Sequence, residues 1–382
     1  MTTLRQAAGS LLVVGLAGTE LTGLERAWLR LVRPAGIILF RRNISDAKQA
    51  RALLSETTAL CAPNSFRCVD VEGGTVDRLR DALAAMPSAQ AVASAARKTG
   101  KPALICEQGE LIALGVQAFG FNATLAPVLD LALADSSEVM GTRSVAATAE
   151  DVVEYAREFL AGLAAHGVAG CGKHFPGLGG GTRDSHFETP EIRRGWWELW
   201  SEDIKPYREL RAELPMVMVN HAAYPDTPGK ERPASASRFW ISTVLRKRIG
   251  YRGIIFSDDL EMGGILKFLP MEEAVVAAVR AGMDLLEICH SAESILRAYE
   301  SLIAEGERSA AFRKLLLARS RETARKRAKL FAGGVPRALT ARQFEALRAR
   351  IVRFQETIAK SAKADASVFA QAHRQAAPVE TA

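Results

Sequence analysis

The stretch Gly253-Ile-Ile-Phe-Ser-Asp258 is a short apolar run that ends in a carboxylate and is followed by a helix-like segment. Seven other runs rich in Val, Ile and Leu repeat this plan, at 11–18, 36–40, 66–70, 124–130, 168–174, 216–221 and 283–289. Most of them are almost continuously apolar, which is typical of parallel strands covered on both faces. Plausible amphipathic helices separate them, at 46–62, 149–166, 237–249 and 271–281.

Eight strand–helix units predict an α/β fold, specifically a single-domain (β/α)8 TIM barrel with extra C-terminal helices. The length up to residue 300 also suits one barrel, which typically takes about 250 residues. An open doubly wound sheet would carry Gly-x-Gly-x-x-Gly at its first strand–helix turn. The turn here reads Gly15-Leu-Ala-Gly18-Thr-Glu, which does not fit that pattern.

The chain divides into three predicted parts. We expect the barrel in 1–305, C-terminal helices packed on it in 306–363, and a disordered tail in 364–382, which is rich in Ala and Gln. The start of the chain allows two interpretations, because 5–18 faintly resembles a signal peptide. We favour a structural strand at 11–18, since the barrel needs it.

Composition excludes several classes of protein. Hydrophobic residues make up 48% of the chain and charged residues 24%, so a large core can form and a disordered protein is excluded. No apolar run approaches the roughly 18–20 residues that span a bilayer, which excludes a transmembrane protein.

The net charge of +7 resides in the C-terminal fifth of the chain, where 301–382 holds 17 Lys and Arg against 7 Asp and Glu. These charges alternate with Leu, Ala and Phe on helix-like segments at 319–329 and 342–353. The pattern favours a solvated helix face over a nucleic-acid surface, with a weak surface for acidic partners as the alternative.

The five cysteines are an odd number and contain no Cys-x-x-Cys pair. The simplest interpretation is buried thiols in a reducing compartment.

Charged side chains gather where the predicted strands end. They are Asp70, Glu72, Asp130, Lys173, His174, His221, Asp258, Asp259 and His290. A single Asp at a strand end is more often a helix N-cap. Because barrel enzymes react at the C-terminal ends of their strands, the convergence of these residues on one rim predicts a catalytic site.

The richest segment is Lys173-His-Phe-Pro-Gly-Leu-Gly-Gly-Gly-Thr-Arg-Asp-Ser-His186. Four glycines between 177 and 181 allow this loop to bend over a pocket. Asp184 stands two residues before His186, close enough to orient the imidazole and leave its other nitrogen free for proton transfer. A Gly-rich surface loop with a chance Asp-x-His remains the alternative.

The second centre is Phe256-Ser-Asp-Asp-Leu-Glu-Met262. Adjacent side chains on an extended backbone point in opposite directions, so one of Asp258 and Asp259 can face the barrel mouth while the other caps the next helix. A carboxylate nucleophile opposite a proton donor is the arrangement that cleaves glycosidic bonds with retention. Two helix caps remain the other interpretation.

Together these motifs resemble the β-N-acetylhexosaminidases of glycoside hydrolase family 3. The same resemblance extends, in order, to Asp70-Val-Glu-Gly-Gly74, Val76-Asp-Arg-Leu79, Leu125-Ala-Pro-Val-Leu-Asp130, Gly141-Thr-Arg-Ser144 and Arg232-Pro-Ala-Ser235. It covers about 11–297. Single-domain members of that family have a TIM barrel and need no metal or organic cofactor.

The resemblance implies roles for eight residues. Asp258 becomes the nucleophile, and Asp184 with His186 becomes a dyad in which the histidine is the general acid/base. The sugar-binding groups become Asp70, Arg78, Arg143, Lys173 and His174. The implied activity removes terminal β-linked N-acetylglucosamine from a small carbohydrate or muropeptide substrate in cytoplasmic peptidoglycan recycling. We expect a monomer or weak dimer without nucleic-acid or membrane partners.

Three positions depart from the family pattern: Thr75, Thr142 and Leu178. They put in doubt the shape of the pocket beyond the N-acetylglucosamine site, and with it the leaving group. Four alternatives remain open: a non-catalytic sugar-binding barrel, a glycoside phosphorylase using the same site, a Schiff-base aldolase acting through Lys173, and a metal-dependent hydrolase. The last would use His174, His186 and Asp258 as ligands.

Overall fold

The computed structural model describes residues 2–181, 189–334 and 336–375. Within them, eight parallel strands form one sheet in the order β6-β3-β2-β1-β10-β9-β8-β7. Their bounds are β1 (Leu12–Val14), β2 (Gly36–Leu39), β3 (Phe66–Val69), β6 (Ala123–Thr124), β7 (Cys171–Phe175), β8 (Met216–Val219), β9 (Ile254–Asp259) and β10 (Leu285–Ile288). Bridges from Ala123 to Ala169 and from Val128 to Lys173 link the two edge strands. The predicted barrel of eight strands is confirmed.

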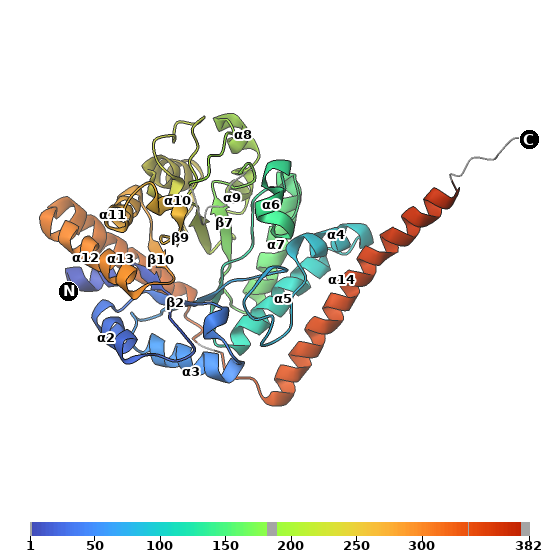
Figure 1. Ribbon diagram of the computed structural model, residues 1–382, viewed down its shortest axis with the longest axis horizontal. Helices are drawn as coiled ribbons and strands as arrows, with labels where there is room; N and C mark the ends of the chain where they lie inside the picture. Colours follow the sequence, from blue (N-terminus) through green and yellow to red (C-terminus); the bar gives the residue numbers. More distant parts are fainter. Residues whose placement is uncertain (1, 182–188, 335, 376–382) are drawn as a thin grey trace, which may run out of the picture.

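Helices surround these strands (Figure 1). The predicted helices are present as α3 (Ala47–Thr58), α7 (Ala149–Ala165), a π-type helix at Phe239–Arg248, and α11 (Met271–Ala281). The other α-helices in the described part of the chain up to residue 308 are α1 (Leu4–Gly9), α2 (Gly23–Val32), α4 (Ala89–Thr99), α5 (Ala103–Ala118), α6 (Ser137–Met140), α8 (Trp196–Ser201), α9 (Lys205–Glu209), α10 (Gly263–Leu266) and α12 (Ala292–Arg308). No helix in the described part of the chain has the length and apolar character of a membrane span.

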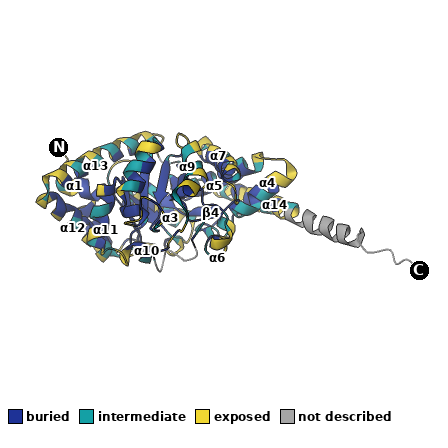
Figure 2. Ribbon diagram, turned by 90° about the horizontal axis from the view of Figure 1, so that it is seen from above, coloured by how far each residue is buried: buried dark blue, intermediate teal, exposed yellow. Residues whose placement is uncertain are grey.

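The barrel strands are apolar on both faces because each face packs against a different cluster. On β10, Leu285 joins the cluster inside the barrel, with Phe256 and Cys289. Its neighbours Leu286 and Ile288 instead join the larger cluster between strands and helices. Alternate residues on a strand point to opposite faces, so a strand buried on both sides must be apolar throughout. Figure 2 shows this burial in dark blue at the centre of the molecule.

The segment 11–18 lies in the barrel as predicted, since it supplies β1 between β2 and β10. The described chain also holds five free cysteines, of which four are buried and Cys106 is half-buried. Three of them, Cys68, Cys171 and Cys289, belong to the apolar cluster inside the barrel.

A short hairpin that the sequence did not predict follows β3. It consists of β4 (Val71–Gly73) and β5 (Val76–Asp77). Gly73 has a φ of 93°, and a Cβ there would lie 2.2 Å from the Pro87 carbonyl oxygen, so only glycine fits this turn. Asp77 accepts amide hydrogen bonds from Leu79 and Met86 and holds the hairpin down. The hairpin thereby sets Glu72 and Arg78 at the barrel rim.

Helix α13 (Ala310–Leu330) packs against α1 and α12 and reaches the N-terminal end of the barrel. Arg327, which is 1% exposed, donates to the Ala35 carbonyl oxygen, and Lys326 donates to that of Gly253. Arg319 and Lys326 both pair with the buried Asp284. The prediction of a solvated basic face was therefore wrong for these three residues. Their cationic ends pair with a buried carboxylate or donate hydrogen bonds to carbonyl oxygens at the barrel base.

Helix α14 (Ala341–Gln375) runs along α4 and α5 on the side of the barrel (Figure 1). Among the side chains that the structure describes up to residue 361, the buried ones are Leu347, Ile351, Phe354 and Ile358. The helical backbone extends beyond residue 363, into the segment that we expected to be a tail. The division of the chain into a barrel, packed helices and a tail stays a prediction.

The cluster around Asp284 predicts a large loss of stability on mutation. Burial alone would raise the pKa of Asp284, but Arg246, Lys326 and Arg319 hold it below its ordinary value. Asp284→Ala leaves these cations without their buried partner and should cost about 3–5 kcal/mol in the free energy of unfolding. Urea denaturation measures this cost.

Glu322→Ala is the matched control, because Glu322 pairs with the same Arg319 and Lys326 but is 42% exposed. We expect it to cost less than about 1 kcal/mol. Equal costs for the two variants would contradict the prediction.

Candidate active site

The C-terminal ends of the barrel strands surround a cavity of about 190 Å³. Six of the eight residues predicted from the sequence line it: Asp70, Arg78, Arg143, Lys173, His174 and Asp258. The other two, Asp184 and His186, lie outside the described residues. The barrel therefore brings together side chains from β7, β9 and the segments that follow β3, β5 and β6.

One wall of the cavity is a network of paired charges. The Lys173 ammonium lies 2.9 Å from Asp70 Oδ1 and 2.6 Å from Glu72 Oε1. Arg143 donates two hydrogen bonds of 2.8 Å to the same Glu72 carboxylate. A bidentate pair of this kind fixes the relative orientation of the guanidinium and the carboxylate as well as the distance between them. The network presents rigid hydrogen-bond donors to the cavity.

The same network sets the charge of its members. Burial would lower the pKa of Lys173, but Asp70 and Glu72 raise it above its ordinary value. Burial would likewise raise the pKa of Glu72, but Arg143 and Lys173 lower it. Lys173 therefore stays protonated at neutral pH. This disfavours the Schiff-base aldolase, which requires a free lysine amine as nucleophile.

His174 is oriented by Asp130, whose Oδ2 lies 2.6 Å from the imidazole Nδ1. Asp130 also accepts the backbone N–H of Leu178 at 2.7 Å, at the start of the Gly-rich loop. The sequence placed Asp130 at the rim but gave it no role. In the structure it positions both the His174 ring and the first residues of the loop.

Asp258 and Asp259 both line the cavity, but their carboxylates make different contacts, and neither is the N-cap of α10. The Asp259 carboxylate accepts the backbone N–H of Glu261 at 3.0 Å and lies 3.3 Å from the His290 ring. Asp258 is half-buried at the cavity, and its Oδ1 accepts the N–H of Asp259 at 3.0 Å. Burial would raise the pKa of Asp258, but nearby groups, His174 foremost, lower it. Asp258 is therefore a carboxylate at neutral pH.

His221, which the sequence also placed at the rim, lies beneath this strand end and does not line the cavity. Its Nδ1 lies 2.7 Å from Ser235 Oγ, and its Nε2 lies 2.9 Å from the Asp259 carbonyl oxygen. Burial lowers its pKa, so the ring is neutral and supports the backbone of β9.

The mouth of the cavity carries an aromatic ring that sequence reasoning missed. The guanidinium groups of Arg42 and Arg78 lie 4.7 and 5.7 Å from the centre of the Phe40 ring. The His290 ring lies 5.5 Å away on a tilted plane. No motif marked Phe40, because it only ends an ordinary apolar run.

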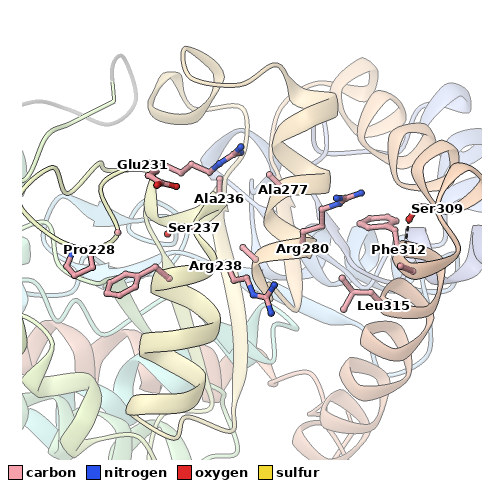
Figure 3. Close-up of a pocket in the computed structure, with 15 residues that line it drawn as sticks. Pro228, Glu231, Ala236, Ser237, Arg238, Ala277, Arg280, Ser309, Phe312 and Leu315 are labelled. Carbon is pink, nitrogen blue, oxygen red and sulfur yellow. Dashed lines mark hydrogen bonds between the residues drawn. The ribbon is translucent and has the colours of Figure 1, made fainter.

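A larger cavity, of about 550 Å³, lies elsewhere, between the segment 228–239, α11 and the start of α13 (Figure 3). Glu231, Arg238 and Phe312 are among its lining residues. None of the six predicted residues that the structure describes is among them. The candidate active site is therefore the smaller cavity at the rim, where the charged groups converge.

Comparisons with known proteins show the family of this chain. The family model described as the glycosyl hydrolase family 3 N terminal domain matches residues 3–316. A curated relative named beta-hexosaminidase, from Methylococcus capsulatus, is 39% identical over 295 residues, which are 76% of this chain and 86% of the relative. Another of that name, from Idiomarina loihiensis, is 36% identical over 73% of this chain and 83% of its own.

Solved structures of other proteins are also similar to this chain. The chain is similar to a family 3 β-N-acetylglucosaminidase from Paenibacillus, with a TM-score of 0.81 and 31% identity over 93% of this chain and 69% of that one. It is also similar to NagZ from Neisseria gonorrhoeae, with a TM-score of 0.74 and 29% identity over 90% and 97% of the two chains. A second structure of that NagZ contains N-trifluoroacetyl-D-glucosamine. This chain therefore belongs to glycosyl hydrolase family 3 and is a glycoside hydrolase.

Proposed function

We propose that this protein removes terminal β-linked N-acetylglucosamine from a small carbohydrate, with retention at the anomeric carbon. The observation that carries the proposal is the ionised Asp258 in a rim cavity whose facing wall holds fixed, charged hydrogen-bond donors. Relatives with this fold are named for N-acetylglucosaminidase or hexosaminidase activity, which supports the choice of sugar.

In the first step, Asp258 attacks the anomeric carbon while His186, protonated and held by Asp184, gives its proton to the departing glycosidic oxygen. The glycosidic bond breaks and a covalent glycosyl–aspartate ester forms. In the second step, neutral His186 takes a proton from water, whose oxygen displaces Asp258 and releases the sugar. An imidazole suits both roles because its unperturbed pKa of about 6.5 lies near neutrality.

The remaining predicted residues hold the sugar. Lys173 and Arg143 donate to hydroxyl or acetamido oxygens, and Asp70 accepts from hydroxyls. Both cations are already fixed by Glu72, so little side-chain entropy is lost when the sugar binds. Arg78, 3.9 Å from Asp70, completes the group on the side nearest Phe40.

We also propose a biological setting for this reaction. The aglycone would come from muropeptides or chitooligosaccharide-type molecules, and the reaction would serve peptidoglycan recycling in the cytoplasm. We propose that the protein acts as a monomer or weak dimer.

A hydrolysis panel tests the proposal. Aryl N-acetyl-β-glucosaminide and N-acetylglucosaminyl-anhydro-muramic acid should be cleaved at least about tenfold faster than aryl β-glucoside, because only they fill an acetamido site. Proton NMR should show the β-anomer of the free sugar first. A preference for the glucoside, or an initial α-anomer, would contradict the proposal. Sugar 1-phosphate formed in phosphate buffer would indicate a phosphorylase, and binding without turnover a non-catalytic barrel.

A further inference from the structure

Glu287 is an acidic residue inside the barrel that has no role in the reaction proposed above. It stands on β10, in the otherwise apolar run Leu285-Leu-Glu-Ile-Cys289, and is 2% exposed. Because alternate residues share a face, its side chain points into the barrel together with Leu285 and Cys289. It lines the same cavity as Asp258. The family resemblance assigns it no role.

Glu287 differs from its acidic neighbours in its ion pairing. Asp70 pairs with Lys173, and Asp259 lies within reach of His290. No ion pair to Glu287 occurs among the residues that the structure describes, and its Oε1 meets only the Cys289 thiol, at 3.5 Å. An unpaired charge at such a buried place is costly, so the carboxyl relieves the cost by keeping its proton.

The electrostatic environment leads to the same conclusion. Burial first, and then the carboxylates of Asp70, Asp259 and Asp258, raise the pKa of Glu287 well above its ordinary value. Among the described residues, the other titratable or cationic groups that line this cavity are Glu72, Arg78, Arg143, Lys173, His174, Cys289 and His290. At neutral pH Glu287 therefore offers an O–H donor beside acids that can only accept.

A sugar hydroxyl is the partner that matches this arrangement. Each hydroxyl can donate one hydrogen bond and accept others. A hydroxyl that donates a hydrogen bond to a neighbouring carboxylate can still accept a hydrogen bond from another group through its lone pairs. We propose that Glu287 is a substrate-binding residue whose neutral carboxyl donates a hydrogen bond to one hydroxyl of the sugar held between Lys173 and Asp258. This inference rests on the proposed function and adds a specificity-determining contact to it.

Two variants test the inference, each measured by kcat/KM on an aryl N-acetyl-β-glucosaminide with a good leaving group. Glu287→Leu keeps the volume but removes the donor, and should lower kcat/KM about tenfold to a hundredfold. Glu287→Gln keeps a neutral donor and should stay within about threefold of the parent. Glu231→Leu and Glu231→Gln, at the exposed cavity of Figure 3, are the matched controls and should change nothing.

Deoxy substrates identify the contact. If Glu287 binds one hydroxyl, the loss caused by Glu287→Leu should disappear on the substrate lacking that hydroxyl and persist on the other deoxy sugars. A loss of equal size on the 3-, 4- and 6-deoxy substrates would overturn the inference, since it would indicate a general packing defect. Unchanged kcat/KM for Glu287→Leu on the parent substrate would overturn it as well.

The pH profile provides a readout that does not depend on folding of the Leu variant. A good leaving group needs no proton from His186, so the alkaline limb of kcat/KM then reports other groups. The parent enzyme should lose activity at alkaline pH as Glu287 ionises, whereas Glu287→Gln should keep it. Identical profiles would contradict the inference. An active Asp258→Ala would instead refute the proposed function, so the two failures are distinguishable.

Discussion

Asp258→Ala should lower kcat on an aryl N-acetyl-β-glucosaminide by roughly 10⁴-fold or more, because removing a covalent nucleophile leaves only binding and acid catalysis. The Asp258 carboxylate lines the cavity and has a lowered pKa, and its loss leaves room beside the anomeric carbon. Sodium azide should restore part of the rate by attacking from that side. The product would then be an α-glycosyl azide, which NMR identifies.

Asp226→Ala is the control for this prediction, since Asp226 is exposed and lies outside the cavity. Its kcat should stay within twofold of the parent value. His186→Ala gives the complementary pattern: substrates with poor leaving groups should suffer most, because they need the proton. More than about 1% residual activity in Asp258→Ala, without azide, would refute the nucleophile assignment.

Glu72→Gln should lower kcat/KM by about 10²- to 10³-fold, although this residue is not expected to touch the reacting atoms. Its carboxylate holds the Lys173 ammonium at 2.6 Å and the Arg143 guanidinium through two bonds. Glutamine offers one acceptor oxygen and turns an N–H₂ donor toward a cation, so at least one of the two becomes misplaced. Two charged contacts to the sugar in the transition state then weaken together.

Stability separates this effect from simple unfolding. Breaking a buried ion pair costs about 3–5 kcal/mol, so kcat/KM must be measured per folded molecule, at a temperature well below the melting transition. Glu213→Gln makes the same change in the exposed pair with Arg157 and should cost less than about 1 kcal/mol without affecting activity. If Glu72→Gln matches that control in both measurements, the network has no role in positioning the sugar.

Much of the fold was predictable because it follows from local patterns. Each of the eight apolar runs overlaps a barrel strand, although the run at 124–130 shares only Thr124 with β6, and the helices at 149–166 and 271–281 match α7 and α11. The hairpin after β3 was missed, because its two strands are too short for any periodicity to show. The basic residues of α13 were misassigned, since a helical pattern does not tell whether a charged face meets solvent or a buried acid such as Asp284.

The sequence by itself determined which chemical groups reach the reacting end of the barrel. Parallel strands end at one rim, so residues such as Asp70, Lys173 and Asp258 had to gather there once the strands were recognised. Tertiary structure alone decided how these groups pair and which are charged. Lys173 lies 103 residues from Asp70, and no local pattern links them or assigns Glu72 to Arg143. Protonation likewise depends on burial and on neighbours in space, which is why the pKa of Asp258 is lowered while that of Glu287, two strand positions from Leu285, is raised.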